Sequence, residues 1–379
     1  MKIILSRKGF DTGAGGSPSP LIPCDEQGNW IKLNCDKTKK WNEEINDWEK
    51  FENQYIQYKM YSIPIPQVPI DNFTSPYSSL RAQDNQGIKL TDVLNDITDN
   101  QIKFCSKEQR NFDYSSINGM SINMHLDPDI KEDTVFRWKN HRFYPAFGQS
   151  DSAEKFLQNQ RIQKGDIFIF FGLFKEVYWS EDKKWAFLHK DCGIYGHVIW
   201  GYMKICDILA LQTGTQVSRT QVSCTVGNIQ NYIHTNVSIH PHMSPDYHQK
   251  EYNSIYVGDE NCTKVFEYYD KKRDLSSKKS ERVDSWYNEN LIKLFDKVPP
   301  KQVSQKQVPQ KQVPRNQGMP LKIDNSSINA SGQWQEAVIK VDKNTLCDEL
   351  LALLNEFGIE ISKDCCQTNN EDNQSAKNR

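Results

Sequence analysis

Residues 164–174 read KGDIFIFFGLF and give the strongest indication of fold class in the sequence. A Lys-Gly-Asp turn leads into residues 167–174, in which the residues that point to either face of a strand are apolar. This pattern predicts a strand that is buried on both faces. Residues 197–209, HVIWGYMKICDIL, and residues 253–257, NSIYV, have the same character, and Lys2–Ser6 predicts a central strand. Together they predict an α+β, or mixed α/β, fold around a largely buried central sheet.

Helical periodicity is confined to a few segments. Residues 88–97 predict a short helix, and residues 150–152 offer N-caps for a second helix with a stripe at Ala153, Phe156 and Leu157. Within residues 30–61, apolar residues recur at steps of three and four, which predicts an amphipathic surface helix; they are Trp41, Ile45, Trp48, Phe51 and Tyr55. The prolines of residues 62–70 restrict that segment to a sheet edge.

Composition divides the chain into a working body and an appended C-terminal part. A tandem repeat, KQVSQ KQVPQ KQVPR, occupies residues 301–315. Because this repeat has little apolar surface to bury, its folding could not offset the entropy lost when the chain is ordered. The predicted units are a body at 1–298 with an insertion at 26–60, a disordered linker at 299–332, a small C-terminal module at 333–362 and a disordered tail at 363–379.

The charge and cysteine content exclude several classes of protein. The net charge of the 379 residues is −2, so no overall basic field indicates nucleic acid, and any such contact has to be local. The ten cysteines include no Cys-x-x-Cys pair, which argues against a zinc ribbon and predicts reduced thiols. The N-terminus has no signal-peptide pattern and no apolar run has membrane length, so we expect a cytoplasmic protein.

The first candidate chemical motif is His125-Leu126-Asp127-Pro128-Asp129. Alternating residues of a stiff turn bring one imidazole and two carboxylates together, which suits a divalent metal or a general acid–base pair. The alternative is structural: Asp127 is then an N-cap with Pro128 at the first helical position, and Asp129 complements the helix dipole.

Histidines also occur in His240-Pro241-His242, just before the 253–257 strand, and at His197, which begins a strand. The proline holds the two imidazoles in a defined relation, as a metal pair or a phosphate contact requires. Each histidine of the pair can equally bond a backbone carbonyl. A histidine at a strand start, such as His197, is more often structural than part of a pocket.

Arg7 and Lys8 follow the first strand and precede a glycine-rich loop at residues 9–16. Cations beside exposed backbone N–H groups suit phosphate or a nucleotide. The loop lacks the Gly-Lys-Ser/Thr ending of a Walker A motif, and Pro18 and Pro20 exclude a Gly-x-Gly-x-x-Gly turn that opens a helix. A basic surface loop without a ligand is the alternative.

Residues 164–174 and 197–209 combine a Lys-Gly-Asp turn, an apolar strand and a second apolar strand. This pattern resembles that of PUA-like and EVE-like β-barrels, which bind RNA or modified bases. In such a barrel portion, Trp200 and Tyr202 would be stacking faces for a base. The same aromatic residues would otherwise belong to the hydrophobic core.

Nine short motifs then occur in a fixed order: SRKGFD, GG-PSP, IPIP, HLDPDI, FGQ, GDIFIFFG-F, HVIWGY, HPH and N-IYV. From Met1 to about Val257 the chain therefore resembles the third of the families named nucleotide-modification-associated domains. That family is inferred to act in DNA or nucleotide modification, largely from phage and bacterial gene neighbourhoods. The resemblance implies a nucleotide or nucleic acid as partner, without a membrane and without a defined reaction.

The motifs of the resemblance carry over a set of polar site candidates: Ser6, Arg7, Lys8, Asp11, His125, Asp127, Asp129, Gln149, His197, His240 and His242. We expect these residues to share one polar hollow at the rim of the sheet. In this hypothesis Arg7 and Lys8 hold phosphate. His125, with Asp127 or Asp129, transfers protons or binds a divalent metal.

In the same hypothesis Asp11 is a further catalytic candidate. Gln149 reads a base edge, since its amide is both donor and acceptor, and His197, His240 and His242 complete the substrate site. The reaction stays open. Two alternatives are a non-catalytic reader of modified bases that recruits a protein partner through residues 334–361, and a structural subunit of a modification complex.

Overall fold

The computed structural model describes a part of the chain that contains the predicted central sheet. Its described residues are 1–8, 18–33, 56–60, 90–97, 130, 144–188, 193–211, 240, 242, 247, 250–275, 352 and 354–360, together with the backbone of the short strands named below.

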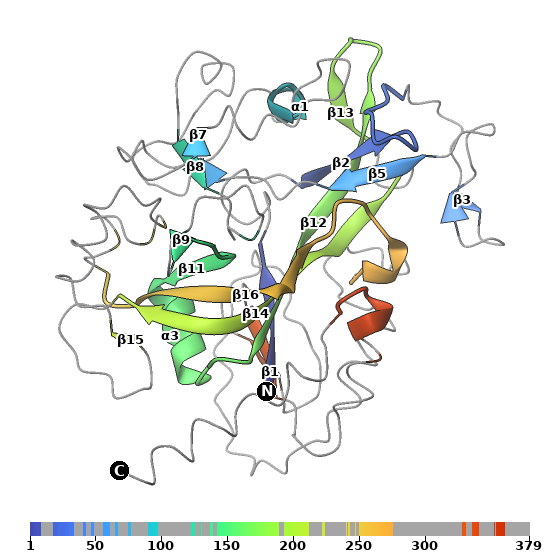
Figure 1. Ribbon diagram of the computed structural model, residues 1–379. Helices are drawn as coiled ribbons and strands as arrows, with labels where there is room; N and C mark the ends of the chain where they lie inside the picture. The colour runs from blue at the N-terminus through green and yellow to red at the C-terminus, as the bar shows by residue number, and fades with distance from the viewer. Residues whose placement is uncertain are drawn as a thin grey trace, which may run out of the picture.

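Within the described residues, an eleven-stranded mixed sheet forms the body (Figure 1). Its main path runs in the order β11-β16-β14-β12-β1-β18-β17. These strands are β11 (Ala146–Ser150), β16 (Asn253–Val265), β14 (Tyr195–Ala210), β12 (Ile167–Trp179), β1 (Lys2–Arg7), β18 (Glu336–Lys340) and β17 (Ile328–Ala330).

Strand β1 lies at the centre of this sheet, as the sequence predicts. It pairs in parallel with β12 and antiparallel with β18, and its residues Ile3 and Ile4 are fully buried. The buried carboxylate of Asp166 accepts hydrogen bonds from the backbone N–H groups of Lys2, at 2.7 Å, and Gln163, at 2.9 Å. The predicted Lys-Gly-Asp turn therefore fixes the start of β1 beside the start of β12.

Further strands pair with the main path or form small separate sheets. Four more strands belong to the main sheet: β2 (Ser19–Cys24), β5 (Gln57–Met60), β13 (Trp185–Phe187) and β15 (Val222–Ser223). The small sheets consist of β3 (Trp41–Asn42) with β4 (Asp47–Trp48), β9 (Arg137–Trp138) with β10 (Arg142–Phe143), and β6 (Ile65–Pro66), β8 (Asn123–His125) and β7 (Ser75–Pro76). The proline-rich β6 is an edge strand, as predicted.

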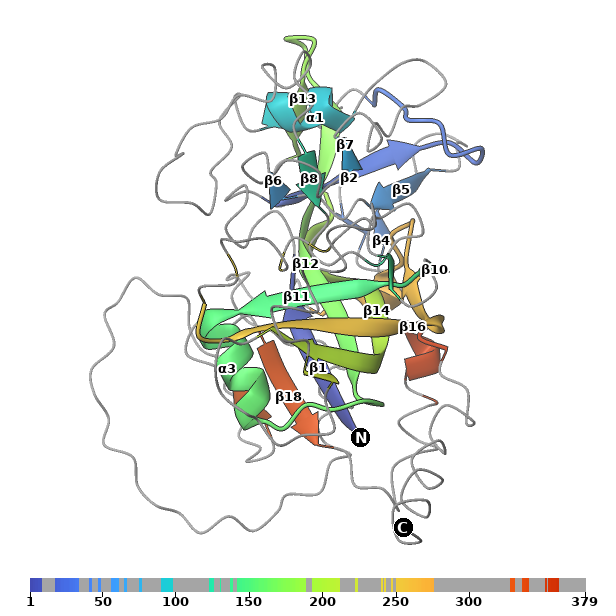
Figure 2. The same ribbon diagram turned by 60° about the vertical axis from the view of Figure 1, so that its left-hand side comes forward.

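The main sheet is curled into a half-barrel. Phe147 on β11 packs edge-to-face against Phe168 and Phe170 on β12, with ring centroids 5.1 and 5.4 Å apart, although β16 and β14 lie between these strands. Figure 2 shows β11, β16 and β14 crossing β1 and β12 at a steep angle. We call the face that carries Phe147, Phe168 and Phe170 the inner face, and the opposite face the outer face.

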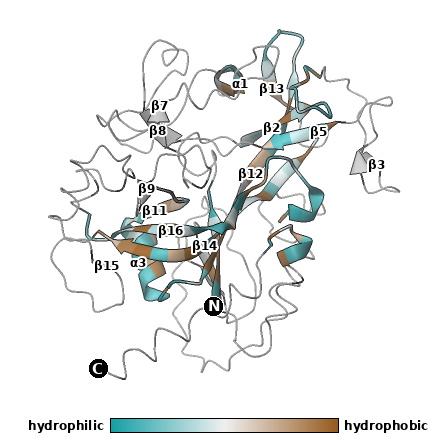
Figure 3. Ribbon diagram, in the orientation of Figure 1, coloured by the Kyte–Doolittle hydropathy of each residue, from teal (hydrophilic) through white to brown (hydrophobic). Residues whose placement is uncertain are grey.

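Few helices accompany the sheet in the described part of the chain. They include α1 (Leu90–Ile97), α3 (Asp151–Asn159), the 3-10 turn η4 (Lys271–Arg273) and helical residues at 352 and 354–356. Helix α3 buries Leu157, as its apolar stripe predicts, but the N-cap Ser150 makes no side-chain capping bond. In Figure 3 the hydrophobic colour is concentrated on β12 and β14, and the turn between β12 and β13 is hydrophilic.

The prediction of a helix in residues 30–61 is wrong at residues 41–42, 47–48 and 57–60, which form the strands β3, β4 and β5. There β3 pairs antiparallel with β4, and Trp41 lies opposite Trp48. The seven-residue spacing of Trp41 and Trp48 in sequence also fits a helical period, so the pattern alone did not distinguish the two structures. The fold is therefore richer in strands than predicted, and the likeness to a PUA-like barrel stays a prediction.

The segment assigned to a C-terminal module contributes to the main sheet and its core. Strand β18 pairs with β1 over Lys2–Ser6, and β17 pairs with β18. The buried residues Leu354, Phe357 and Ile359 belong to the same hydrophobic core as Ile4 and Phe168. The predicted linker at 299–332 lies outside the described residues, except for β17.

Two expectations from composition concern thiols and membranes. The cysteines that the structure describes, Cys24, Cys206 and Cys262, are free thiols. Among the described helices, none combines the length and the hydrophobicity that a membrane crossing needs.

We expect Phe147→Ala to lower the free energy of unfolding by about 3–5 kcal/mol, because it removes a fully buried ring that joins β11 to β12. Chemical denaturation monitored by tryptophan fluorescence measures this loss. The exposed Glu181→Ala serves as control and should change stability by less than about 0.5 kcal/mol. Equal effects of the two substitutions would show that the sheet does not close on Phe147.

Candidate functional site

The backbone of Lys8 is fixed where β1 ends. Its N–H donates to the carbonyl of Phe171 at 2.7 Å, and its carbonyl accepts from the indole Nε1 of Trp200 at 2.7 Å. The register between β12 and β14 shifts after Phe170, which leaves Trp200 as an extra residue stacked on the Phe170 ring. This bulge aims the indole at Lys8, so the first residue after β1 has a defined position.

The side chain of Lys8 crosses the inner face to the edge strand β11. Its ammonium lies 4.8 Å from the centroid of the Phe147 ring, and the residue is only 5% exposed. Ser6 shares this face, since it pairs with Phe170 and strand residues alternate between faces. A desolvated cation on an aromatic ring is a strong local positive charge in a chain of net charge −2.

Two residues beyond Phe147, Gln149 is also buried on the inner face of β11, opposite Ser254. Helix α3 covers this region with the buried carboxylate of Glu154. That carboxylate accepts hydrogen bonds from the hydroxyls of Ser254, at 2.7 Å, and Tyr256, at 2.8 Å. The buried carboxylate therefore orients both hydroxyls and joins helix α3 to strand β16.

Sequence reasoning did not select Glu154 or Tyr256. A signal was present, because Glu154 precedes Leu157 by one helical turn and therefore lies on the buried side of α3. A carboxylate on the apolar face of a helix predicts a buried polar partner. Gln158, on the same helix, also donates to this carboxylate at 2.9 Å. The partners Ser254 and Tyr256 belong to a strand about a hundred residues later, and their pairing with Glu154 follows only from the fold.

His240 and His242 lie on the outer face of the same edge strand. An added Cβ at Gly148 would lie 2.2 Å from Cδ2 of His242 and 2.5 Å from Cε1 of His240. Only glycine at position 148 therefore leaves space for both imidazoles against the β11 backbone. The two rings are 5.4 Å apart, and both histidines are buried.

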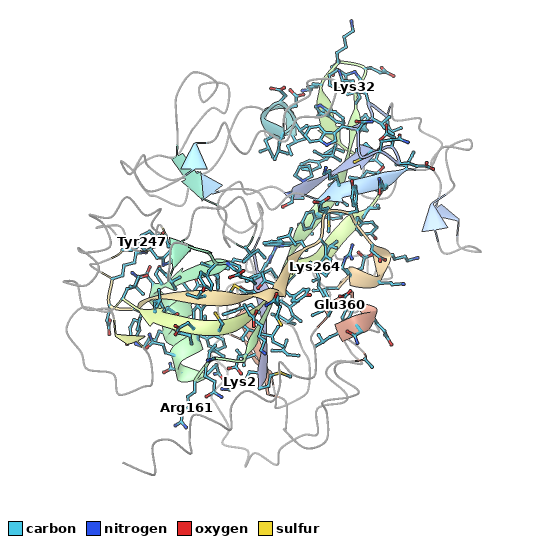
Figure 4. The ribbon with its side chains drawn as sticks, viewed as in Figure 1. Lys2, Lys32, Arg161, Tyr247, Lys264 and Glu360 are labelled. Atoms are coloured by element: carbon cyan, nitrogen blue, oxygen red, sulfur yellow. The ribbon has the colours of Figure 1, made fainter. Side chains whose placement is uncertain are left out.

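Contacts on several sides hold the ring of His242. Its Nδ1 lies 2.8 Å from Oδ1 of Asn253, and its backbone N–H donates to Nδ1 of His240 at 3.2 Å. Tyr247 stacks on the imidazole with ring centroids 4.1 Å apart. Figure 4 shows Tyr247 beside β11, far from Lys32 at the other end of the molecule.

Two distant chain segments, the end of β1 and residues 240–242, thus meet at consecutive residues of β11. Lys8 contacts Phe147, the histidine pair contacts Gly148, and Gln149 comes next. We call Lys8, residues 147–149, His240 and His242 the β11 rim. The groups do not share one face, because Lys8 and Gln149 lie on the inner face and the histidines on the outer face, one strand thickness apart.

Arg7 and His197 lie elsewhere. Arg7 pairs with Phe171, whose ring is 6.2 Å from the ring of His197, so both residues lie on the outer face around β12. Burial, and after it the charge of Arg7, lowers the pKa of His197 from 6.5 to about 3. His197 is therefore a neutral imidazole at neutral pH, and Arg7 and Lys8 point to opposite faces of β1.

The remaining candidates belong to parts of the chain that the structure does not describe in full. Asp11, Asp127 and Asp129 lie outside the described residues. For His125 the backbone alone is described, and it occupies the central strand of a small sheet, opposite Ile65. Among the described side chains, no group of three or more His, Cys, Asp and Glu residues is placed to hold a metal ion.

The protein is a mixed β-sheet protein whose sheet is curled into a half-barrel. Its candidate site lies at the edge strand β11, where a cation, an amide and two imidazoles are found. Residues 54–339 match the sequence model of the nucleotide modification associated domain 3 family. Because this match covers more than half of the 379 residues, the chain belongs to that family. No curated protein and no solved structure matches the chain.

The family match confirms the suspected family but has different bounds. It begins at residue 54 and ends at residue 339, within β18, whereas the motif resemblance spans Met1 to about Val257. The matched region contains His125, Gln149, His197 and the histidine pair, and it leaves β1 with Lys8 outside. Lys8 is therefore assigned to the site by its contact with Phe147 and not by the family match.

We expect His197 to make the protein less stable in acid. The unfolded chain takes up a proton near pH 6.5, and the folded chain resists it down to about pH 3, so stability falls as the pH is lowered through this window. The free energy of unfolding of the wild type should drop by up to about 1.4 kcal/mol per pH unit more than that of His197→Gln. Denaturant titrations from pH 7 to pH 4 measure both slopes, and parallel curves would contradict a buried neutral imidazole.

Proposed function

We propose that the chain binds a nucleotide, or a base within nucleic acid, at the β11 rim and takes part in its modification. The observation that carries this proposal is that Lys8 and Gln149 share the inner face at β11, with the histidine pair on the outer face of the same edge strand. In a member of a family associated with nucleotide modification, such convergent polar groups on a packed scaffold are the best candidate for the ligand site.

The inner side of the rim suits the phosphate and the base edge. Lys8 supplies a cation with little exposure to water, and an ammonium–phosphate hydrogen bond is strong in such a place. Gln149 on the same face offers one acceptor and two donor hydrogens, which complement the donor and acceptor groups of a base edge. Lys8 and Gln149 keep the roles that the sequence predicts for them.

The sequence-based hypothesis assigns acid–base or metal chemistry to His125, Asp127, Asp129 and Asp11, and we retain it as a proposal. We also retain three predictions from the sequence as proposals. They are an α+β fold with a PUA-like barrel portion, a cytoplasmic location, and a protein partner that binds the C-terminal part of the chain.

Lys8→Met tests the proposal because methionine keeps the buried chain length and removes the charge. We expect isothermal titration calorimetry to show binding of at least one of the four 2′-deoxynucleoside 5′-monophosphates to the full chain. The substitution should weaken that binding about ten-fold or more, the equivalent of one charge-assisted hydrogen bond.

Lys204→Met is the matched control, since Lys204 is equally buried at 6% exposure but lies on β14 opposite Ile167. It should bind the nucleotide like the wild type. Absence of binding by any of the four nucleotides, or equal losses in the two variants, would refute the site. Binding to a modified oligonucleotide without any turnover would favour the non-catalytic reader.

A further inference from the structure

The second half of β12 carries a row of aromatic and basic side chains on the outer face of the sheet. Strand β1 pairs with β12 only as far as Phe171, and beyond it β12 pairs with β2, β13 and the beginning of β14. Strand residues alternate between faces, so Lys175 and Trp179 share the outer face with Phe171. Their cross-strand neighbours are Tyr195, opposite Lys175, and Trp185, opposite Trp179.

Two lysine ammonium groups lie over aromatic rings of this row. The ammonium of Lys175 is 5.2 Å from the ring centroid of Phe187 and 5.4 Å from that of Tyr195. The ammonium of Lys32 is 4.0 Å from a ring centroid of Trp179, whose backbone N–H donates to the residue after Lys32. We call Lys32, Lys175, Trp179, Phe187 and Tyr195 the aromatic–basic stripe.

The aromatic–basic stripe has solvent-exposed surface and a local positive charge. Lys32 is exposed, and the other four residues are partly exposed. Neither lysine forms an ion pair within the described part of the chain, because the side-chain contacts of both are with aromatic rings. Burial lowers the pKa of the Lys175 ammonium, so an anionic partner would stabilise its charged form. The exposed turn at residues 181–184 adds two acidic and two basic residues and therefore no net charge.

Aromatic rings beside cations form the kind of surface that binds single-stranded nucleic acid, because each base has a face that can stack and each phosphate needs a counter-charge. The contact between an exposed ammonium and a ring is weaker than the stacking of a base on that ring. A base can therefore displace the ammonium from the ring, and the ammonium then binds the neighbouring phosphate. A duplex or an acidic peptide offers negative charge but no free base faces.

We infer that the aromatic–basic stripe binds the part of a single-stranded nucleic acid that flanks the nucleotide held at the β11 rim. In this inference Trp179 and Phe187 stack on bases, and Lys32 and Lys175 contact phosphates. It deepens the proposed function, since the assignment of a polymer as substrate rests on the rim holding one nucleotide of the same strand. Figure 4 shows Lys32 and Tyr247 at opposite ends of the described side chains, so the strand has to span several nucleotides.

Fluorescence anisotropy of the full chain with a labelled single-stranded oligodeoxynucleotide of about 20 nucleotides, longer than an ordinary single-strand site, tests the inference. Lys175→Met should weaken binding about three-fold or more and reduce the slope of log affinity against log salt by about 0.7, the value for one phosphate contact. Phe187→Leu retains apolar bulk but removes the stacking face, and it should weaken binding about five-fold or more. Thermal melting checks that both variants fold.

Lys264→Met is the matched control. The ammonium of Lys264 also lies over a ring, 5.9 Å from the centroid of Phe266, but the residue pairs with Tyr202, about 20 Å along β14 from Tyr195. This variant should bind the oligonucleotide like the wild type. The inference is overturned if the wild type does not bind the oligonucleotide, or if it binds the corresponding duplex or an oligoglutamate peptide of the same length equally well.

The outcomes distinguish this inference from the proposed function. If a deoxynucleoside monophosphate binds and requires Lys8, but Lys175→Met and Phe187→Leu bind the oligonucleotide like the wild type, the inference alone is overturned. If no monophosphate binds, but the oligonucleotide binds and requires Lys175 and Phe187, the proposed site at the rim fails and the aromatic–basic stripe stands as a nucleic-acid surface.

Discussion

The packing of Phe147 against Phe168 and Phe170 is the interaction on which the rest of the structure depends. It joins an edge strand to a central strand across two others, and so it curls the sheet into a half-barrel. The curl brings the end of β1 close to β11, and Lys8 then covers the same ring that closes the sheet. A core contact and the candidate site therefore share one residue.

The groups of the β11 rim lie on the two opposite faces of a single edge strand. Phe147 and Gln149 face inward, where Lys8 and helix α3 lie, and the missing side chain of Gly148 opens the outer face to two imidazoles. The end of β1 and residues 240–242, which are distant in sequence, thereby contact neighbouring residues of β11. The arrangement differs from the single hollow that the motifs predicted, because Arg7 and His197 belong to another part of the outer face.

Much of the sheet could be predicted because long apolar runs and a Lys-Gly-Asp turn leave few alternatives, and β1, β12, β14 and β16 follow from them. Alternation along β1 would also have separated Arg7 from Lys8. The antiparallel pairing of β3 with β4 was missed because the spacing of Trp41 and Trp48 also fits a helix. The Asn253–His242 and Glu154–Tyr256 pairs could not be predicted, since both depend on tertiary packing rather than on a local pattern.

A crystal structure of the full chain with a bound deoxynucleoside monophosphate tests the central claim most directly. We predict a phosphate within hydrogen-bonding distance of the Lys8 ammonium and the base against Gln149, with Phe147 of β11 still packed against Phe168 and Phe170 of β12. A nucleotide bound on a surface away from β11, or a β1 end separated from Phe147, would contradict it.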